Sequence, residues 1–153
     1  MTATATAGVM IRRAIVLLAL AGWSREARAQ LTVSGSPAQL TVSSAVAGSA
    51  PSAVSNSSTT YSVSSAGIGH HGITVQLNSA MPAGVTLTVT LASAGNGTSV
   101  GPVTLTTTAQ DAITGISKKI TGATITYTLS ATPAAGVVPV QTRRVTLTYV
   151  STP

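Results

Sequence analysis

The stretch Val85-Thr86-Leu87-Thr88-Val89-Thr90-Leu91 alternates aliphatic and threonine side chains without a break. Strict alternation sends successive side chains to opposite faces of a β-strand and fits no helical period. The four aliphatic residues therefore share one face, and burying them would contribute roughly 6 to 12 kcal/mol before the ordering entropy is subtracted. The threonines point the other way, where β-branched side chains suit a pleated surface in contact with water. We predict that residues 85–91 form a central strand of the hydrophobic core.

The same alternation recurs along the chain after Gln30, with turn-forming residues between the segments. The clearest further strands are Ile73–Leu77, Ile125–Leu129 and Val145–Tyr149, and no segment after residue 30 has a helical period. Shorter alternating segments start at Leu31, Leu40, Tyr61 and Val103. Short strands at a regular spacing are typical of an all-β sandwich or barrel.

Several segments break the alternation and are interpreted as connections. Residues 43–58 are rich in serine, alanine and glycine and predict a low-complexity loop or linker. Glycines at 67–72 and an Asn-Gly pair within 95–99 predict two exposed loops. Residues 111–115 are interpreted as a turn, and residues 116–120 as a short edge strand.

The N-terminal residues have the organisation of a secretory leader. Two arginines precede the apolar run 14–22, and small residues occupy positions 27 and 29. This pattern predicts a helical signal peptide over residues 1–29, cleaved before Gln30. An uncleaved membrane anchor would need about 20 apolar residues. We therefore expect one secreted domain, residues 30–153, at an extracellular, periplasmic or cell-surface location, with no membrane span after cleavage. The chain has no cysteine, so its stability must rest on the apolar core rather than on disulfides.

Charge is sparse once the leader is removed. The formal net charge is +6, and the four leader arginines with the leader's one acid account for +3 of it. The remaining cations form two pairs, Lys118–Lys119 and Arg143–Arg144, and the only remaining acid is Asp111. Nucleic-acid binding would need a denser basic face with stacking aromatic residues. We expect no nucleic-acid partner and a solvated surface for both pairs.

The residues that catalysis requires are scarce. A single carboxylate outside the leader excludes two-carboxylate glycoside hydrolysis within one chain, and no Gly-x-Ser-x-Gly elbow is present to expose a nucleophile. His70 and His71 are the only metal-ligand candidates, but neighbours in an extended chain point in opposite directions and no acid or thiol lies nearby to complete a site. We expect no catalytic, cofactor-binding or metal-binding residues, and a solvent-exposed loop position for the two histidines.

Three tyrosines are the only aromatic residues outside the leader on which a sugar ring could stack. Tyr127 and Tyr149 are in phase with the aliphatic positions of their strands, so we expect them in the core. The environment of Tyr61 is left open. The sequons at Asn56 and Asn96 are interpreted as turn residues.

The strands 85–91, 125–129 and 145–149, with the loop Pro133-Ala134-Ala135-Gly136 before the last of them, resemble secreted bacterial immunoglobulin-like modules of surface fibres and fimbria-like subunits. The resemblance covers about residues 31–150. It implies a single immunoglobulin-like antiparallel β-sandwich of about seven to nine strands.

Two functional hypotheses follow. Strands of high β-propensity and low charge pair readily with other strands at an open edge. The first hypothesis is a secreted or cell-surface structural protein that associates with itself, or with other surface proteins, by β-strand addition. Residues 31–42 could be the donated strand, or could pair within their own domain. The alternative is a monomeric ligand-binding or adhesion-type module that uses the loops 67–72 and 95–99.

Overall fold

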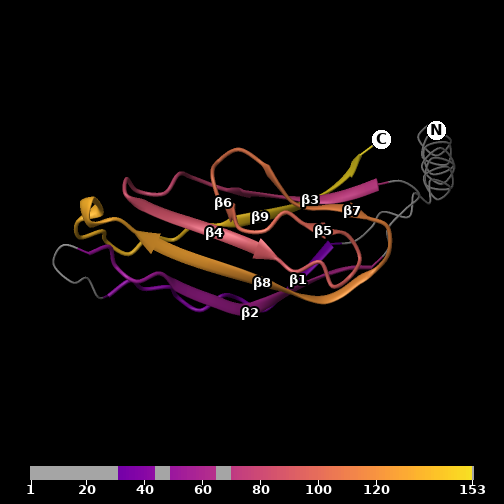
Figure 1. The fold of residues 1–153 in the computed structure, drawn as a ribbon, viewed down its shortest axis with the longest axis horizontal. Helices are drawn as coiled ribbons and strands as arrows, with labels where there is room; N and C mark the ends of the chain where they lie inside the picture. The colour runs from indigo at the N-terminus through magenta and orange to yellow at the C-terminus, as the bar shows by residue number, and fades with distance from the viewer. Residues whose placement is uncertain (1–30, 44–48, 65–69, 153) are drawn as a thin grey trace, which may run out of the picture.

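The computed structural model describes residues 31–43, 49–64 and 70–152, which form two antiparallel β-sheets (Figure 1). The first sheet has the strand order β1-β2-β8-β4-β6. Its strands are β1 (Leu31–Ser34), β2 (Val54–Val63), β8 (Ile120–Ala131), β4 (Val85–Leu91) and β6 (Val103–Thr104). The second sheet has the order β5-β7-β3-β9. Its strands are β5 (Thr98–Ser99), β7 (Gln110–Ile116), β3 (His70–Leu77) and β9 (Val145–Thr152).

The all-β architecture predicted from the alternation is confirmed. The described part of the chain holds nine strands, and its only helical element is a 3-10 turn, η1 (Pro133–Ala135). The proposed signal peptide, residues 1–29, lies outside the described residues.

Strand β4 has the predicted bounds, but of its four aliphatic side chains only Val89 and Leu91 are fully buried, whereas Val85 and Leu87 are partly buried. Val89 and Leu91 are 0% exposed, whereas the threonines between and before them are only partly buried. β4 is an interior strand, but the centre of its sheet is β8, which pairs with β4 on one side and with β2 on the other. The β4–β8 pairing runs without a shift from Val85 opposite Ala131 to Leu91 opposite Ile125.

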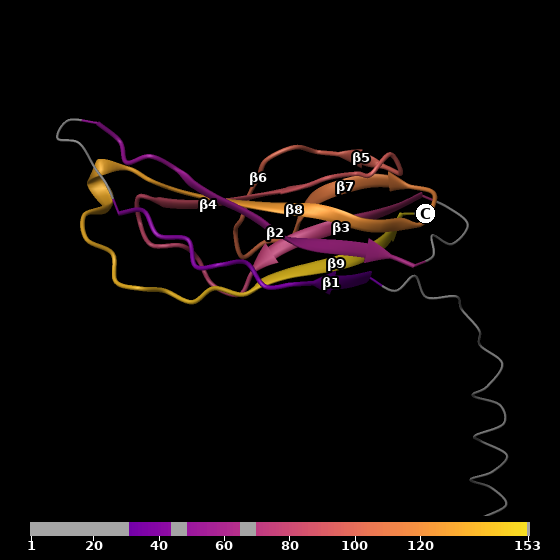
Figure 2. The same ribbon diagram turned by 90° about the horizontal axis from the view of Figure 1, so that it is seen from below.

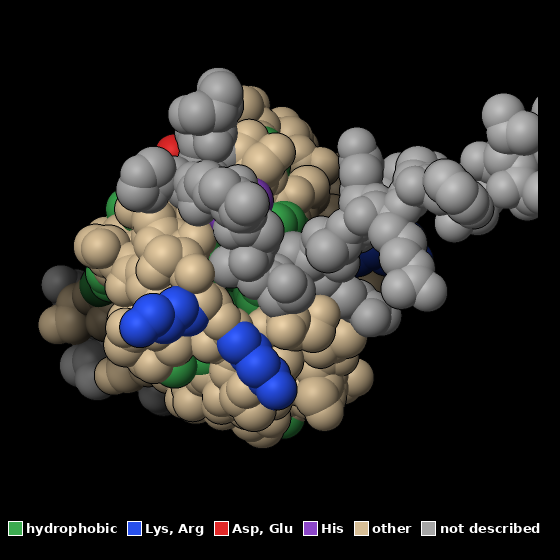
Figure 3. Space-filling model, turned by 90° about the vertical axis from the view of Figure 1, so that its right-hand side faces the viewer, with side chains coloured by type: hydrophobic (Ala, Val, Ile, Leu, Met, Phe, Trp, Pro, Cys, Tyr) green, Lys and Arg blue, Asp and Glu red, His purple; other side chains and the backbone are tan. Residues whose placement is uncertain are grey.

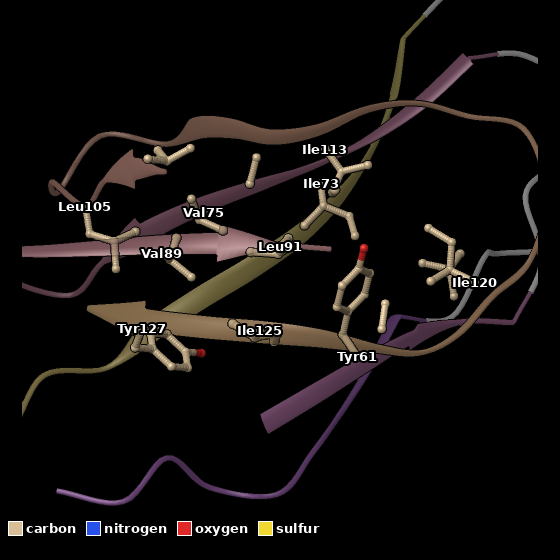
Figure 4. Packing of buried hydrophobic residues seen from close by; sticks show 14 of the residues in the cluster. Tyr61, Ile73, Val75, Val89, Leu91, Leu105, Ile113, Ile120, Ile125 and Tyr127 are labelled. Atoms are coloured by element: carbon tan, nitrogen blue, oxygen red, sulfur yellow. The ribbon is translucent and has the colours of Figure 1, made fainter. Parts of the chain in front are cut away.

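The core lies between the two sheets (Figure 4). Ile73 and Val75 of β3 face Val89 and Leu91 of β4, and none of the four is more than 1% exposed. Burying a branched aliphatic side chain is worth roughly 1.5 to 3 kcal/mol. The hydrophobic contact between the sheets is therefore the main source of stability in a chain that has no disulfide.

Two predicted connections are wrong, because each contains part of a strand. Strand β2 begins at Val54, inside the predicted loop 43–58, because pairing with β8 extends it through a run of serines. Residues 111–115, interpreted as a turn, belong to β7, whose Ala112 and Ile113 are 0% exposed between β3 and β5.

The predicted edge strand at residues 116–120 is also wrong. Ile116 ends β7 and Ile120 begins β8, so the three residues between them make the connection from one sheet to the other. Both isoleucines are 0% exposed. Their shared burial fixes the two ends of this short connection against the core.

Candidate functional site

Strand β9 forms an unpaired edge of the second sheet. It pairs with β3 along its whole length, from Leu77 opposite Val145 to His70 opposite Thr152. No other strand of the described chain pairs with β9, so its second side carries free backbone groups. Such an edge is a template for pairing with another extended segment.

The register identifies which backbone groups face outward. The Asn78 amide donates to the Arg144 carbonyl at 3.0 Å, which makes these two residues a hydrogen-bonded pair next to the first register pair of β9. Hydrogen-bonded and non-hydrogen-bonded pairs alternate along an antiparallel ladder. The amide and carbonyl groups of Val145, Leu147 and Tyr149 therefore point away from β3, toward the open side.

The inward side chains of β9 are incompletely covered. Val145, Leu147 and Tyr149 pack against the core but are only partly buried. Their partners on β3, by contrast, are almost fully covered: Leu77 is 3% exposed, Val75 1% and Ile73 0%. The core is thus closed on the β3 side and incomplete at the β9 edge.

The first sheet also ends near this place. β1 is its last strand, and Figure 2 shows β1 and β9 along the same lower side of the molecule. Val33 lies opposite the buried Tyr61 but is itself 49% exposed. Both sheets therefore end on this side with aliphatic side chains that have no complete cover.

His71 and Tyr149 place polar atoms at the inner side of the same edge. Their rings are stacked, with centroids 5.1 Å apart and an interplanar angle of 23°. Both ring nitrogens of His71 and the hydroxyl of Tyr149 are buried and have no hydrogen-bond partner. Burial raises the pKa of the Tyr149 phenol. The inner side of this edge therefore contains buried polar atoms that have no hydrogen-bond partner.

The expectation of an exposed histidine loop is wrong. β3 starts at His70, and His71 is 7% exposed between Ile116 of β7 and Ser151 of β9. Pairing on both sides extends the strand into the glycine-containing segment. Across the residues that the structure describes, no group of three or more histidine, cysteine, aspartate and glutamate side chains could hold a metal ion.

The two other tyrosines belong to the core. Tyr127 is 6% exposed, as its phase predicts, and burial raises the pKa of its phenol. Tyr61, whose position the sequence left open, is 1% exposed, and its hydroxyl donates to the Ala92 carbonyl at 2.6 Å. Burial raises the pKa of Tyr61 to about 12. Neither ring is available on the surface for stacking on a sugar.

The loops of the alternative hypothesis are only partly open to a ligand. Residues 67–69 lie outside the described chain, and residues 70–72 belong to β3. In the 95–99 loop, the Asn96 side-chain amide donates to the Lys119 carbonyl at 2.9 Å, and the Ser99 hydroxyl donates to the Leu91 carbonyl at 2.6 Å. These polar groups hold the loop onto its own domain.

Of the two sequon asparagines, Asn96 is a turn residue as predicted, with its amide donating to the Ser93 carbonyl at 3.0 Å, whereas the prediction for Asn56 is wrong. Asn56 lies in β2, where its side-chain oxygen accepts hydrogen bonds from both the amide and the hydroxyl of Ser58. This local contact accompanies the register shift between residues 56 and 59.

The charged side chains do not form a continuous basic surface. Lys118 and Lys119 are exposed in the β7–β8 connection. Figure 3 shows a few cationic side chains and an acidic side chain on an end of the molecule that is mostly uncharged. In the β8–β9 connection, Arg143 donates through Nε to the Ala80 carbonyl at 3.2 Å.

Comparisons of the chain with protein-family models, with curated proteins and with solved structures found no match. Within the described residues there is no helix with the length and apolar character needed to cross a membrane.

Proposed function

We propose that this protein is a non-catalytic structural subunit, exported to the cell surface or the medium, that assembles by β-strand addition at the open edge of β9. The proposal includes the immunoglobulin-like identity of the sandwich, for which the resemblance of its strands to surface-fibre modules is the support. The observation that carries it is the contrast across one strand pair. The inward residues of β9 are partly exposed, whereas those of β3 are buried.

An added strand would complete both the backbone hydrogen bonding and the apolar packing at the β9 edge. It would pair with the outward backbone groups of β9, each hydrogen bond contributing roughly 0.5 to 1.5 kcal/mol net. Its inward side chains would cover Leu147 and Tyr149 and remove more apolar area from water. Backbone pairing with alternate side chains seated in a core is the established mode of strand addition.

The β9 edge also lacks the features by which sheet proteins prevent such pairing. Natural edges are commonly protected by lysine, proline, a bulge or a very short strand. β9 has eight residues, contains no charged residue and no proline, and pairs with β3 without a register shift. By contrast, β1 is four residues long and is followed by Gly35 and Pro37.

The proposal is tested by adding charge to the edge strand. Thr146→Lys/Thr148→Lys places two lysines on β9, on the face away from the core. Thr86→Lys/Thr88→Lys makes the same chemical change on β4, an interior strand that lies between β8 and β6. We expect the β9 variant to lose most of its assembly, about tenfold or more, because repulsion opposes pairing at a charged edge. The β4 variant should assemble like the parent chain.

Assembly is measured by sedimentation velocity and electron microscopy of the purified protein at matched concentrations. A parent chain that stays monomeric and forms no fibres at high concentration would overturn the proposal and favour the monomeric binding module. Equal loss of assembly in both variants would show that β9 is not the pairing edge.

A further inference from the structure

A strand-forming segment occurs twice near the start of the described chain. The sequence Leu31-Thr32-Val33-Ser34 recurs as Leu40-Thr41-Val42-Ser43, and each copy follows a glutamine. The first copy is strand β1. The second copy belongs to no strand, although the structure describes it.

The first copy is held on β2 by four register pairs, from Leu31 opposite Val63 to Ser34 opposite Thr60. On the outward face, the Thr32 hydroxyl donates to the Ser62 carbonyl at 3.5 Å. On the inward face, Leu31 packs against the core and is partly buried.

The second copy already lies against the same core with the same alternation. Leu40 packs on the hydrophobic cluster, and Val42 is partly buried, while Thr41 and Ser43 are exposed. It thus has the aliphatic side and the hydroxyl side of β1 but lacks a strand partner.

We propose that the two copies compete for one place on β2. In the exchanged register, residues 40–43 pair with Thr60–Val63 and residues 31–34 are released as an arm. Because the four side chains are identical, the side-chain contacts with β2 are preserved on exchange. The released arm then pairs with the open β9 edge of another copy. This last step rests on the proposed function.

The connecting chain is long enough for the exchange. In the exchanged register, Ser43 lies opposite Thr60, so the chain between Ser43 and Val54 must span the length of β2 from Thr60 to Val54. That distance is about 20 Å at roughly 3.3 Å per strand residue. The intervening residues 44–53 reach roughly 33 Å when extended.

The proposed exchange also gives a physical reason why the segment occurs twice. A subunit that donated β1 without a replacement would expose the edge of β2 and the inward faces of Tyr61 and Val63, which are 1% and 0% exposed now. With a replacement strand, donation leaves the donor's own sheet complete. The cost of releasing the arm falls accordingly.

Disulfide trapping tests the exchange directly, because the chain has no cysteine of its own. Thr32→Cys/Ser62→Cys locks the first copy on β2, since facing residues in an antiparallel pair lie within disulfide reach. Thr41→Cys/Ser62→Cys can close within one chain only in the exchanged register. Thr41→Cys/Thr104→Cys is the matched control, because β6 is the far edge of the same sheet.

We expect both Ser62 variants to form the intramolecular disulfide under mild oxidation, and the Thr104 control to form several-fold less. Once oxidised, the Thr32 variant should stop assembling, whereas the Thr41 variant should still assemble because its first copy is free. A Thr41–Ser62 yield no higher than that of the control would overturn the exchange.

The two proposals can fail separately in this experiment. If both disulfides form but no variant or parent chain assembles, the exchange stands and the proposed function fails. If the parent chain assembles while the Thr41–Ser62 disulfide stays at the control level, the proposed function stands and the exchange fails.

Discussion

At the scale of single residues, neighbours on β4 occupy opposite environments. Val89 is 0% exposed and faces Ile73 and Val75 across the core, whereas Thr88 is partly buried on the outer face opposite Thr104 and Thr128. This difference follows from the alternation of side chains along a strand.

Val89→Asp should therefore destabilise the protein by about 3 kcal/mol or more, because it buries a carboxylate without a partner. Thr88→Lys should change the free energy of unfolding by no more than about 0.5 kcal/mol, because a lysine on that face reaches water. Urea denaturation followed by circular dichroism measures both. Equal losses in the two variants would mean that the assignment of faces is wrong.

Tyr61 should make stability fall at alkaline pH. Its pKa is raised from 10.0 to about 12 by burial, so between these values the unfolded chain ionises this phenol while the folded chain does not. The contribution of Tyr61 is fully present below about pH 10 and is lost as the pH rises through about 12. Tyr127 and Tyr149 shift in the same direction.

We expect Tyr61→Phe to lower stability at neutral pH by roughly 0.5 to 1.5 kcal/mol, because the hydrogen bond to the Ala92 carbonyl is lost. The same variant should lose less stability than the parent chain between about pH 10 and 12. Urea midpoints measured across this range test the prediction, and parallel pH curves for the two proteins would contradict it.

Alternation in the regular strands predicted which side chains point inward, but not how completely each is covered. Tyr127 is buried as its phase predicts, whereas Tyr149 packs against the core but stays partly exposed. His71 was misplaced, because its burial comes from β7 and β9, which are distant in sequence. The sequence pattern around His71 does not indicate which distant strands will cover its side chain.

At the scale of elements, long alternating segments were recognised and interrupted ones were missed. β4 and the regular parts of β3, β8 and β9 were found because apolar and polar residues alternate through them. β7 was missed because Asp111 and Gly115 resemble turn residues, although Ile113 is buried between two partner strands. There, tertiary pairing overrides local propensity.

The turn that leads into β4 requires a glycine. Gly84 has a φ of 76°, and a Cβ at this position would lie 2.8 Å from Thr132 Oγ1 and 2.9 Å from the Ala135 amide nitrogen. The Gly84 carbonyl accepts a hydrogen bond from the Thr132 amide at 2.8 Å, which joins this turn to η1. Gly122 has a φ of 59° but nothing within 4 Å of the corresponding Cβ position.

Gly122→Ala should therefore show the backbone strain alone, about 1 to 2 kcal/mol. Gly84→Ala should cost at least about 1 kcal/mol more, because the new methyl group also collides with backbone atoms. Thermal or urea unfolding of the two variants gives the comparison. A Gly84→Ala variant no less stable than Gly122→Ala would show that the turn can relax.

At the scale of the whole molecule, the open edge could not be predicted from the sequence. The alternation in β9 identified a strand but not its neighbours, because strand order depends on pairings between distant segments such as β2 and β8. The sequence led us to expect strand addition and a donor at residues 31–42. The structure shows that β9 is an edge strand with one open side, and that residues 31–34 pair within their own domain.

The central claim is that the outward amides of β9 are free in one molecule and paired in the assembly. Residue-resolved amide hydrogen exchange on dilute and concentrated protein tests it most directly. In dilute protein, we predict fast exchange of the Leu147 and Tyr149 amides. The Thr146 and Thr148 amides should exchange slowly, because they point toward β3. In concentrated protein, all four should exchange slowly. Protection of Leu147 and Tyr149 in the dilute monomer, or their continued fast exchange in the assembled protein, would contradict the account.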